Sequence, residues 1–499
     1  MALRLQLSQL ILVNRAYMAS RWRFISSCAS PIDDADDLQS RISRLVIPRS
    51  AKSVLQDWVD EGHKISVHEL RRIARQLMKR RRLKHALEIF TWMEGYKGCQ
   101  ISANDHALTL ELIAKVHNLR RAEEYFGRIT DTSSQKAACL ILLRCYGRER
   151  CIEKAEALMV KISSLGLAVN PHPFNEMMKL YKATSQFDKV ISVIQLMKEN
   201  KIPQNVLSYN LWMDACNEVS GVALAERVYK EMVNDKNVQV GWSTLSTLAN
   251  IYLKAGLLEK ANLTLQNAEK KLSTSDRLGY LFLITIYTSL NNKDGVLRLW
   301  KACKAVEGRI TCANYMCILL CLIKVGDIDK AEKVFMEYES QCRNYDVRVS
   351  NILLGAYMRN GLIEKAESLH LRTLGRGGHP NYKTWEILME GWVRSQNMDK
   401  AINAMKKCFS MLKDCKWRPS PGIVVAIAEH FEKSGNFEEA KQYLKVIRPL
   451  GLCSLQVYKS LLRMHVSTKQ PTQEILEMMK EDEIDMDDEI SALLWGFKV

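Results

Sequence analysis

Histidine, cysteine and carboxylate residues at short spacings are the side chains of this 499-residue chain that could bind a catalytic zinc ion. Zinc-dependent deaminases need an H-x-E motif and, further along the chain, P-C-x-x-C. One H-x-E occurs, at His430–Glu432, but only Cys453 follows it. The pattern is incomplete, and the sequence therefore predicts no deaminase site.

The fourteen cysteines also lack the spacing of a metal site. Cys312, Cys317 and Cys321 fall on one predicted helix, but no histidine lies near them in the sequence, and C-x-x-C is absent. Structural zinc needs four closely placed Cys or His ligands. Because free cysteine behaves as a small hydrophobic residue, we expect buried thiols in a reducing compartment, with no metal and no cofactor.

Other catalytic motifs are missing as well. The sequence contains no H-E-x-x-H, no G-x-x-x-x-G-K-[ST] and no G-x-S-x-G, the patterns that supply a metal-bound water, a phosphate-binding loop and a nucleophilic serine. We therefore expect a protein that is not an enzyme.

The chain repeats one short motif. "YLKAGLLEKANLTL" at 252–265 returns as "YMRNGLIEKAESL" at 357–369. A small residue inside this motif recurs at spacings of 33 to 39 residues, most often 35, and we call it the anchor. The anchors are Ala86, Ala122, Ala155, Val190, Ala225, Ala261, Val296, Ala331, Ala366, Ala401 and Ala440.

Residues around the anchors follow a helical pattern. An apolar residue stands three before the anchor in ten of eleven units and four after it in ten of eleven, which marks one face of an α-helix. An aromatic residue stands nine before it in seven units, and glycine often separates the two. Each unit is thus predicted to be a hairpin of two helices, and such hairpins must stack to bury their apolar faces.

The period and the motif resemble the pentatricopeptide repeat of plant organelle proteins, of the plain class without catalytic extensions. A 34-residue tetratricopeptide array is disfavoured because its Trp and Leu-Gly signature is absent. Unit ends such as "KIPQN" (201–205) and helix starts such as "YNLWM" (209–213) match the family. The resemblance covers residues 66–470 and implies an all-α, right-handed superhelical solenoid of about 11–12 helix–turn–helix repeats.

The resemblance also implies a binding partner, single-stranded organelle RNA, read one base per repeat by the fifth and the last residue of each unit. The candidate pairs are Asn175 with Asn205, Asn351 with Asn381, and Ser246 with Asp276; Asn210 lies in a 36-residue unit whose last residue is Val240 or Gly241. In the family, Asn–Asn pairs favour pyrimidines and hydroxyl–Asp pairs favour guanine. Each asparagine also has a local interpretation, because Asn favours helix caps and turns.

Most other units have no readable pair. Their fifth residues include Leu140, Leu281, Met316 and Val425, which offer a base no hydrogen bond. A second hypothesis therefore stays open: a structural subunit of an organelle ribosome or another ribonucleoprotein, binding protein or structured RNA through its extended surface.

The net charge of +16 is unevenly distributed. Residues 1–32 carry +4 and residues 471–499 carry −7, which leaves +19 for the rest. A basic cluster for phosphate groups is predicted at Arg71, Arg72, Arg75, Lys79, Arg80, Arg81, Arg82 and Lys84. The alternative is that these side chains only solvate helix surfaces. We expect residues 471–499 to form an acidic tail whose run at 481–489 is solvated; competition of that run with RNA for the basic cluster is the disfavoured alternative.

Residues 1–32 have the composition of a cleaved transit peptide. They contain four arginines, five serines and no acidic residue. We expect a mitochondrial protein, with the chloroplast as the alternative; a secretory signal on the run from Leu5 to Val13 is disfavoured because arginines follow it. Residues 33–65 form a lead-in to the repeats. No stretch approaches eighteen uninterrupted apolar residues, so no membrane span is predicted.

Overall fold

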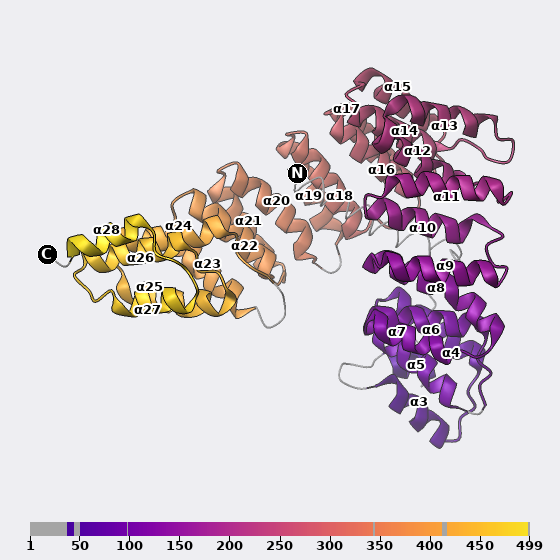
Figure 1. Ribbon diagram of the computed structural model, residues 1–499, viewed down its shortest axis with the longest axis horizontal. Helices are drawn as coiled ribbons and strands as arrows, with labels where there is room; N and C mark the ends of the chain where they lie inside the picture. Colours follow the sequence, from indigo (N-terminus) through magenta and orange to yellow (C-terminus); the bar gives the residue numbers. More distant parts are fainter. Residues whose placement is uncertain (1–36, 44–49, 97, 343–344, 412–416, 498–499) are drawn as a thin grey trace. The chain divides into compact units, whose positions relative to one another are not determined.

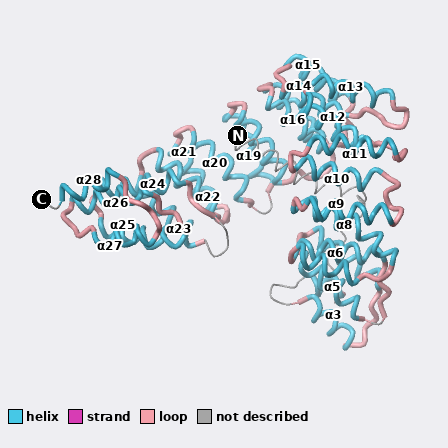
Figure 2. Tube along the Cα trace, in the orientation of Figure 1, coloured by secondary structure: helices cyan, strands magenta, loops and turns pink. Residues whose placement is uncertain are grey.

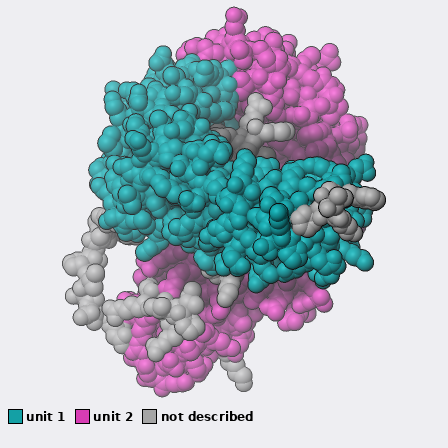
Figure 3. Space-filling model, turned by 90° about the vertical axis from the view of Figure 1, so that its left-hand side faces the viewer, with its two compact units in different colours: residues 1–17, 274–499 teal, residues 18–273 magenta. Residues whose placement is uncertain are grey.

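A computed structural model describes residues 37–43, 50–96, 98–342, 345–411 and 417–497, and all regular structure within these ranges is helical (Figures 1 and 2). The predicted transit peptide, residues 1–32, lies outside the described residues. The described chain divides into two compact units at residues 273 and 274, shown in separate colours in Figure 3. Each unit is an array of paired helices.

The N-terminal unit contains two short leading helices and six hairpins. Its helices are α2 (Leu38–Ser43), α3 (Ala51–Asp60), α4 (Val67–Lys79), α5 (Leu83–Gly95), α6 (Ala103–Val116), α7 (Leu119–Arg128), α8 (Thr132–Glu149), α9 (Ile152–Ser164), α10 (Pro171–Ala183), α11 (Phe187–Glu199), α12 (Val206–Ser220), α13 (Val222–Asn234), α14 (Trp242–Lys254) and α15 (Leu258–Lys270).

The C-terminal unit contains six further hairpins and a last helix. Its helices are α16 (Arg277–Ser289), α17 (Lys293–Ala305), α18 (Cys312–Lys324), α19 (Ile328–Gln341), α20 (Val347–Arg359), α21 (Ile363–Gly375), α22 (Tyr382–Arg394), α23 (Met398–Ser410), α24 (Pro421–Ser434), α25 (Phe437–Ile447), the 3₁₀ turn η2 (Arg448–Leu450), α26 (Leu455–Ser467), α27 (Gln473–Glu481) and α28 (Asp488–Phe497).

The eleven anchors lie on the second helices of the hairpins and are buried. Every one of them, Val190 and Val296 included, is at most 1 % exposed. The first helices of successive hairpins contact each other, for example α10 with α12 and α20 with α22, and each second helix packs on the first helix of its own hairpin. The predicted all-α array of helix–turn–helix repeats is confirmed in the described residues.

A left-handed residue closes the first helix of many hairpins. Gly256, Gly326 and Gly361 have φ of 77°, 77° and 71°. At Gly361 the chain turns so that the Leu362 amide donates to the Tyr357 carbonyl, which satisfies a carbonyl at the helix end. Glycine suits this position because a left-handed conformation costs it no steric strain.

In several repeats the recurring aromatic residue ties the repeat to the one before it. Tyr181 Oη and Lys189 Nζ each donate to Glu156 Oε1 at 2.8 Å, and Lys189 also lies over the Tyr181 ring. The same arrangement recurs at Tyr252, Lys260 and Glu226, at Tyr357, Lys365 and Glu332, and at Trp392, Lys400 and Glu367. This bridge explains why an aromatic residue with a polar end stands at that position.

The acidic C-terminal segment differs from the expected solvated tail. It forms α27 and α28, and α28 contacts α26 as a further first helix would. Asp482 accepts hydrogen bonds from Arg448, at 2.9 Å from Nη2, and from Tyr458 Oη. The segment packs on the array through the buried side chains of Ile475, Met479 and Ile490 as well as through these polar contacts.

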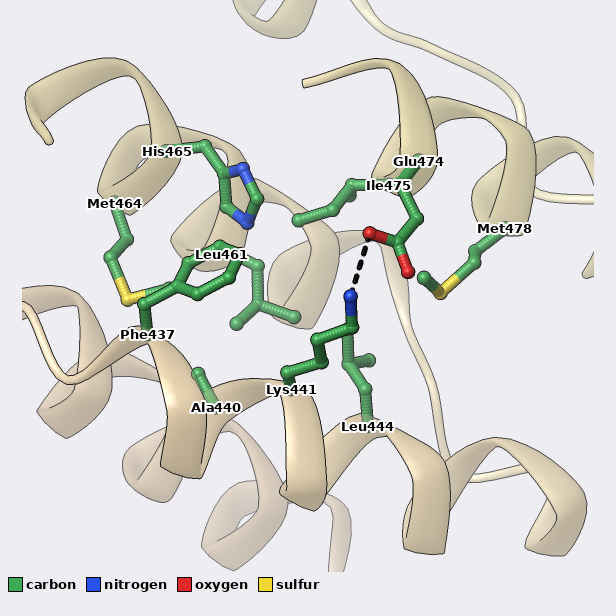
Figure 4. Close-up of a pocket in the computed structure, with 10 residues that line it drawn as sticks. All are labelled: Phe437, Ala440, Lys441, Leu444, Leu461, Met464, His465, Glu474, Ile475 and Met478. Carbon is green, nitrogen blue, oxygen red and sulfur yellow. Dashed lines mark hydrogen bonds and ion pairs between the residues drawn. The ribbon is translucent and has the colours of Figure 1, made fainter. Parts of the chain in front are cut away.

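The described part of the chain holds neither a metal-binding cluster nor a helix long and apolar enough to cross a membrane. All twelve cysteines in it are free thiols, and Cys317 and Cys321 are buried. A pocket of about 10 Å³ lies between α25, α26 and α27, lined on one side by Phe437 and His465 and on the other by the Lys441–Glu474 ion pair (3.0 Å) (Figure 4). That volume holds at most one water molecule, so it is a packing defect.

Candidate nucleic-acid interface

Three residue positions come into contact at several of the places where one first helix packs against the next. They are the fifth residue of one first helix, the residue that precedes the next first helix, and the third residue of that next helix. We call each such place a step, named by its two first helices, and we call the three residues its triad.

The α10–α12 step holds the first predicted pair in direct contact. Asn175 Nδ2 donates to Asn205 Oδ1 at 3.2 Å. Asn205 caps α12 and accepts from the Ser208 amide at 3.0 Å, while Ser208 Oγ donates to Asn175 Oδ1 at 2.8 Å. Asn175 and Ser208 are buried, and Asn205 is partly exposed. The three side chains therefore form one closed hydrogen-bonded triad.

The α20–α22 step, in the other unit, repeats this arrangement. Asn351 Nδ2 donates to Asn381 Oδ1 at 3.3 Å, and Thr384 Oγ1 donates to Asn351 Oδ1 at 3.0 Å. The Thr384 amide donates to Asn381 Oδ1 at 3.0 Å, so Asn381 caps α22 as Asn205 caps α12. Two independent copies of one geometry indicate a specified arrangement, because neither unit constrains the other here.

The hydrogen bonds fix which atoms the two closed triads present. A backbone N–H can only donate, so the oxygen of Asn205 must face the Ser208 amide. That oxygen also accepts from Asn175, and its two lone pairs are then used. The remaining hydrogen-bonding group of the partly exposed Asn205 is its Nδ2, a donor. Closed triads therefore offer N–H donors to an approaching base.

The α12–α14 step lacks the middle residue of the triad. Asn210 occupies the fifth position and Thr244 the third, but Gly241, which has no side chain, precedes α14. Asn210 Oδ1 and Thr244 Oγ1 are buried and have no hydrogen-bond partner. Of the two partners predicted for Asn210, Gly241 rather than Val240 holds the cap position.

The Ser246–Asp276 pair falls on the two sides of the unit boundary. Ser246 is buried in α14, and its Oγ donates to the Trp242 carbonyl of its own helix at 2.7 Å. Asp276 caps α16 by accepting from the Gly279 amide at 2.9 Å. Each residue is described only within its own unit, and its role in binding a base stays a prediction.

At the α4–α6 step, one residue of the predicted phosphate cluster is bound to a carboxylate of the chain itself. Arg71 is the fifth residue of α4, and its guanidinium binds Asp105, the third residue of α6, with Nη2 2.6 Å from Oδ2. Asp105 also accepts from the Ser102 hydroxyl at 2.7 Å. Burial opposes ionisation of Asp105, but the bonds from Arg71 and Ser102 outweigh it and lower its pKa. Arg71 is thus part of a closed ion pair and is not available to a phosphate group.

Other members of the basic cluster are placed differently. Arg72 pairs with Glu69 at 3.4 Å on the same helix, and Arg82 donates to the Ile42 carbonyl at 3.4 Å. The exposed members are Arg72, Arg75, Lys79, Arg80, Arg81 and Lys84. These side chains are exposed, and their contact with a phosphate backbone stays a prediction.

At the α26–α28 step, ion pairs rather than neutral hydrogen bonds join the two first helices. Lys459, the fifth residue of α26, lies 2.5 Å from both Asp487 and Glu489 through Nζ, and Asp487 precedes α28. These hydrogen bonds raise the pKa of Lys459. Arg463, one turn further along α26, also pairs with Glu489. The sequence analysis missed this step, because the partners of Lys459 lie about thirty residues away in the segment assigned to a tail.

Family models match three stretches of the chain. The pentatricopeptide repeat domain matches residues 157–218, and the PPR repeat matches residues 138–167 and 349–377. Pentatricopeptide repeat-containing protein At5g27460 of Arabidopsis thaliana is 54% identical over 471 residues, which is 93% of this chain and 96% of that one. The chain belongs to the pentatricopeptide repeat family, and it is a non-catalytic member.

The chain is also similar to two further Arabidopsis relatives and to solved structures of one protein. At1g02370, mitochondrial, is 30% identical (92% of this chain, 86% of that one), and the large ribosomal subunit protein mL101 is 33% identical (82% and 84%). Crystal structures of PPR10 from maize and of PPR10 in complex with an 18-nt PSAJ RNA element share the fold. Their TM-scores are 0.50 and 0.52 at 17% and 16% identity, and each match covers 90% of this chain and 68% of PPR10.

The hydroxyl residues Ser208 and Thr384 are triad members that the sequence analysis did not name. A local pattern could have found them, because each stands three residues after the capping asparagine, which is the spacing of a capping box. Their contact with the fifth-position asparagine of the preceding repeat, 33 residues earlier, required the structure.

Proposed function

We propose that this protein is a non-catalytic RNA-binding helical-repeat protein that acts in organelle RNA metabolism, in transcript stabilisation, processing or translation. The observation that carries the proposal is the pair of closed triads at the α10–α12 and α20–α22 steps. Each presents a capping asparagine whose free amide hydrogens suit the acceptor atoms of a base edge, such as the O2 of a pyrimidine. The fold likeness to an RNA-bound protein and the excess of positive charge support it.

A selection from a random RNA pool tests this proposal. Wild type is expected to enrich a motif in which one nucleotide loses its preference in the double variant Asn351→Ala, Asn381→Ala. The discrimination lost is about 1–3 kcal/mol, by analogy with bidentate base contacts. If wild type binds RNA at low salt but enriches no motif, base reading is wrong.

The exposed basic residues provide the matched comparison for that selection. Neutralising Arg75, Lys79 and Arg80 together is expected to weaken binding to all sequences alike and to flatten its salt dependence, because phosphate contacts release counterions. A change of the selected motif in this variant would contradict the assignment of these residues to phosphate groups.

The predicted leader and a relative named as mitochondrial support a mitochondrial site of action, with the chloroplast as the alternative. Isolated mitochondria should import the precursor and shorten it, and deletion of residues 1–32 should abolish import. Import of the truncated chain would show that the leader assignment is wrong, and import by isolated chloroplasts alone would favour the alternative.

A structural role in an organelle ribosome is the second candidate. The observation that favours it is the 33% identity to large ribosomal subunit protein mL101, together with fifth residues such as Leu281 and Met316 that are apolar. Sedimentation of the native protein separates the two functions. Co-migration with ribosomal subunits at low salt that resists single-strand nuclease supports the structural role, whereas release by the nuclease supports binding to single-stranded RNA.

A further inference from the structure

Ion pairs near the surface hold helix α28 to α26. Lys459 Nζ lies 2.5 Å from a carboxylate oxygen of Asp487 and of Glu489, and Arg463 also pairs with Glu489. The bonds from Lys459 and Arg463 lower the pKa of Glu489, so this carboxylate stays ionised at neutral pH. The side chains of Asp487 and Glu489 are 38 % and 52 % exposed, and salt therefore screens these pairs.

Apolar packing contributes less to α28 than to the other first helices. Among residues 488–494, whose side chains the structure describes, Ile490 is buried, while Ser491 and Ala492 are exposed. The first helix α26, by contrast, buries seven of its thirteen residues. Helices with few buried apolar contacts belong to the part of a protein that opens most easily.

The segment that precedes α28 is anchored separately. Helix α27 buries Ile475 and Met479, and Asp482 at its end accepts hydrogen bonds from Arg448. Residues 484–487, between this anchor and α28, have no regular secondary structure. Helix α28 can therefore leave α26 on this tether while α27 stays packed on the array.

We propose that α28 is a displaceable latch, whose carboxylates hold the two cations of α26 until the phosphate groups of single-stranded RNA replace them. This inference rests on the proposed function, RNA binding, and adds a contact that regulates it. With α28 in place the Lys459 side chain is 11 % exposed, so RNA reaches it by displacing the carboxylates. The exchange is chemically matched, because carboxylate and phosphate oxygens accept the same charge-assisted hydrogen bonds from an ammonium or a guanidinium group.

The other step that is closed by an ion pair does not share this property. At α4–α6 the carboxylate of Asp105 is buried, and α6 also packs against α5, α7 and α8. The surrounding helices therefore fix the pair between Asp105 and Arg71. The pairs of Lys459 depend instead on a helix whose main neighbour is α26. Of these two steps, the C-terminal one combines covered cations with a cover that can move.

The double variant Asp487→Asn, Glu489→Gln of the full chain tests this inference. Asparagine at 487 can still accept the hydrogen bond from the Ile490 amide, so the variant keeps the cap of α28 and loses the ion pairs. The matched control is Glu483→Gln, Asp485→Asn. It removes the same charge from the same segment at two exposed residues that do not pair with α26. The probe is an oligouridylate.

At low salt the Asp487→Asn, Glu489→Gln protein should bind the oligouridylate about fivefold more tightly than the control, since RNA no longer has to break the ion pairs. The logarithm of its affinity should also fall more steeply with the logarithm of salt concentration, by about 0.7 for each phosphate group newly neutralised. Adding Lys459→Gln and Arg463→Gln should remove this gain. In wild type, saturating oligouridylate should accelerate hydrogen exchange of the α28 amides.

The outcomes separate this inference from the proposed function. If wild type binds the oligouridylate while exchange of the α28 amides slows or stays unchanged, the latch is wrong and RNA binding stands. A double variant that binds no more tightly than its control overturns the latch as well, as does a gain that survives the loss of both cations. If none of the proteins binds the oligouridylate, the proposed function fails and this inference fails with it.

Discussion

The first and last steps of the described repeats, α4–α6 and α26–α28, differ from the two closed triads, which belong to interior repeats. At α4–α6 and α26–α28 the fifth residue is a cation, Arg71 or Lys459, held by carboxylates of the next first helix and its cap. At α10–α12 and α20–α22 the fifth residue is an asparagine held by a neutral amide and a hydroxyl. The helix register is the same in all four steps. The side chains alone decide whether a step is sealed by charge or keeps free amide hydrogens.

The comparison also shows where positive charge can act. A cation that is paired with a carboxylate of its own chain offers little to a phosphate group, because the pair is already neutral. Arg71, and Lys459 while α28 is in place, therefore contribute to the net charge but not to a binding surface. We expect bases to be read at interior steps, where neutral triads keep donors or acceptors available.

Breaking the sealed N-terminal step should have the largest effect. Asp105→Ala leaves the guanidinium of Arg71 without its partner and removes the capping box of α6. We expect a loss of about 3 kcal/mol in the stability of this region, the lower end for a broken buried pair because Arg71 is partly exposed. Native-state hydrogen exchange of the α4–α6 amides measures it. Arg72→Ala, which breaks an exposed pair, should cost less than about 1 kcal/mol, and equal losses would contradict the assignment.

Removing the hydroxyl of a closed triad should have a smaller but clear effect. Thr384→Val keeps the shape of the side chain and leaves Asn351 Oδ1 buried without its donor, at a cost of about 1–3 kcal/mol. Thr244→Val removes a hydroxyl that has no partner, so its cost should be near zero or negative. Thermal unfolding of both variants measures the difference. Equal destabilisation would show that the closed and open triads do not differ as described.

Acid should weaken the sealed steps and spare the closed triads. The folded-state pKa of Asp105 is lowered, since its bonds to Arg71 and Ser102 outweigh burial, and the pKa of Asp487 is lowered by its bond to Lys459. Stability from a lowered pKa is fully present above the ordinary value of about 3.9 and is lost as the pH falls through the folded-state value.

Melting curves between pH 6 and pH 3 test this pH dependence. The melting temperature should fall most steeply below pH 4, and Asp105→Asn should flatten that fall. The variant Asn351→Ala, Asn381→Ala contains no change in a titrating group and should follow the wild-type pH profile. A steeper or flatter profile in that variant would contradict the contrast between charged and neutral steps.

The bridges between repeats should give the smallest effect and separate stability from base reading. Glu332→Gln weakens the contacts with Tyr357 and Lys365; because Glu332 and Lys365 are partly exposed, we expect a cost of about 0.5–1 kcal/mol. The selected RNA motif should not change, because Glu332 belongs to no triad. The measurement pairs thermal unfolding with the RNA selection, and a shifted motif would mean that the bridges also position the reading steps.

The amino-acid sequence by itself determined the paired helices, the buried anchors and the register of the asparagine pairs. These features follow from spacings along the sequence, because the helical periodicity and the 35-residue period can be counted without knowledge of the fold. The prediction that Asn175 belongs with Asn205, and Asn351 with Asn381, placed residues that do hydrogen bond.

Tertiary structure alone decided which polar groups remain available. Arg71 and Asp105 are 34 residues apart, Ser208 and Asn175 are 33 apart, and Lys459 and Glu489 are 30 apart. Such contacts depend on how one hairpin stacks on the next, which no local pattern records. The same stacking turns an acidic tail into a closing helix and leaves Asn210 and Thr244 unpaired beside Gly241. The missing side chain of Gly241 matters because α12 and α14 pack together and leave Asn210 and Thr244 without another hydrogen-bond partner.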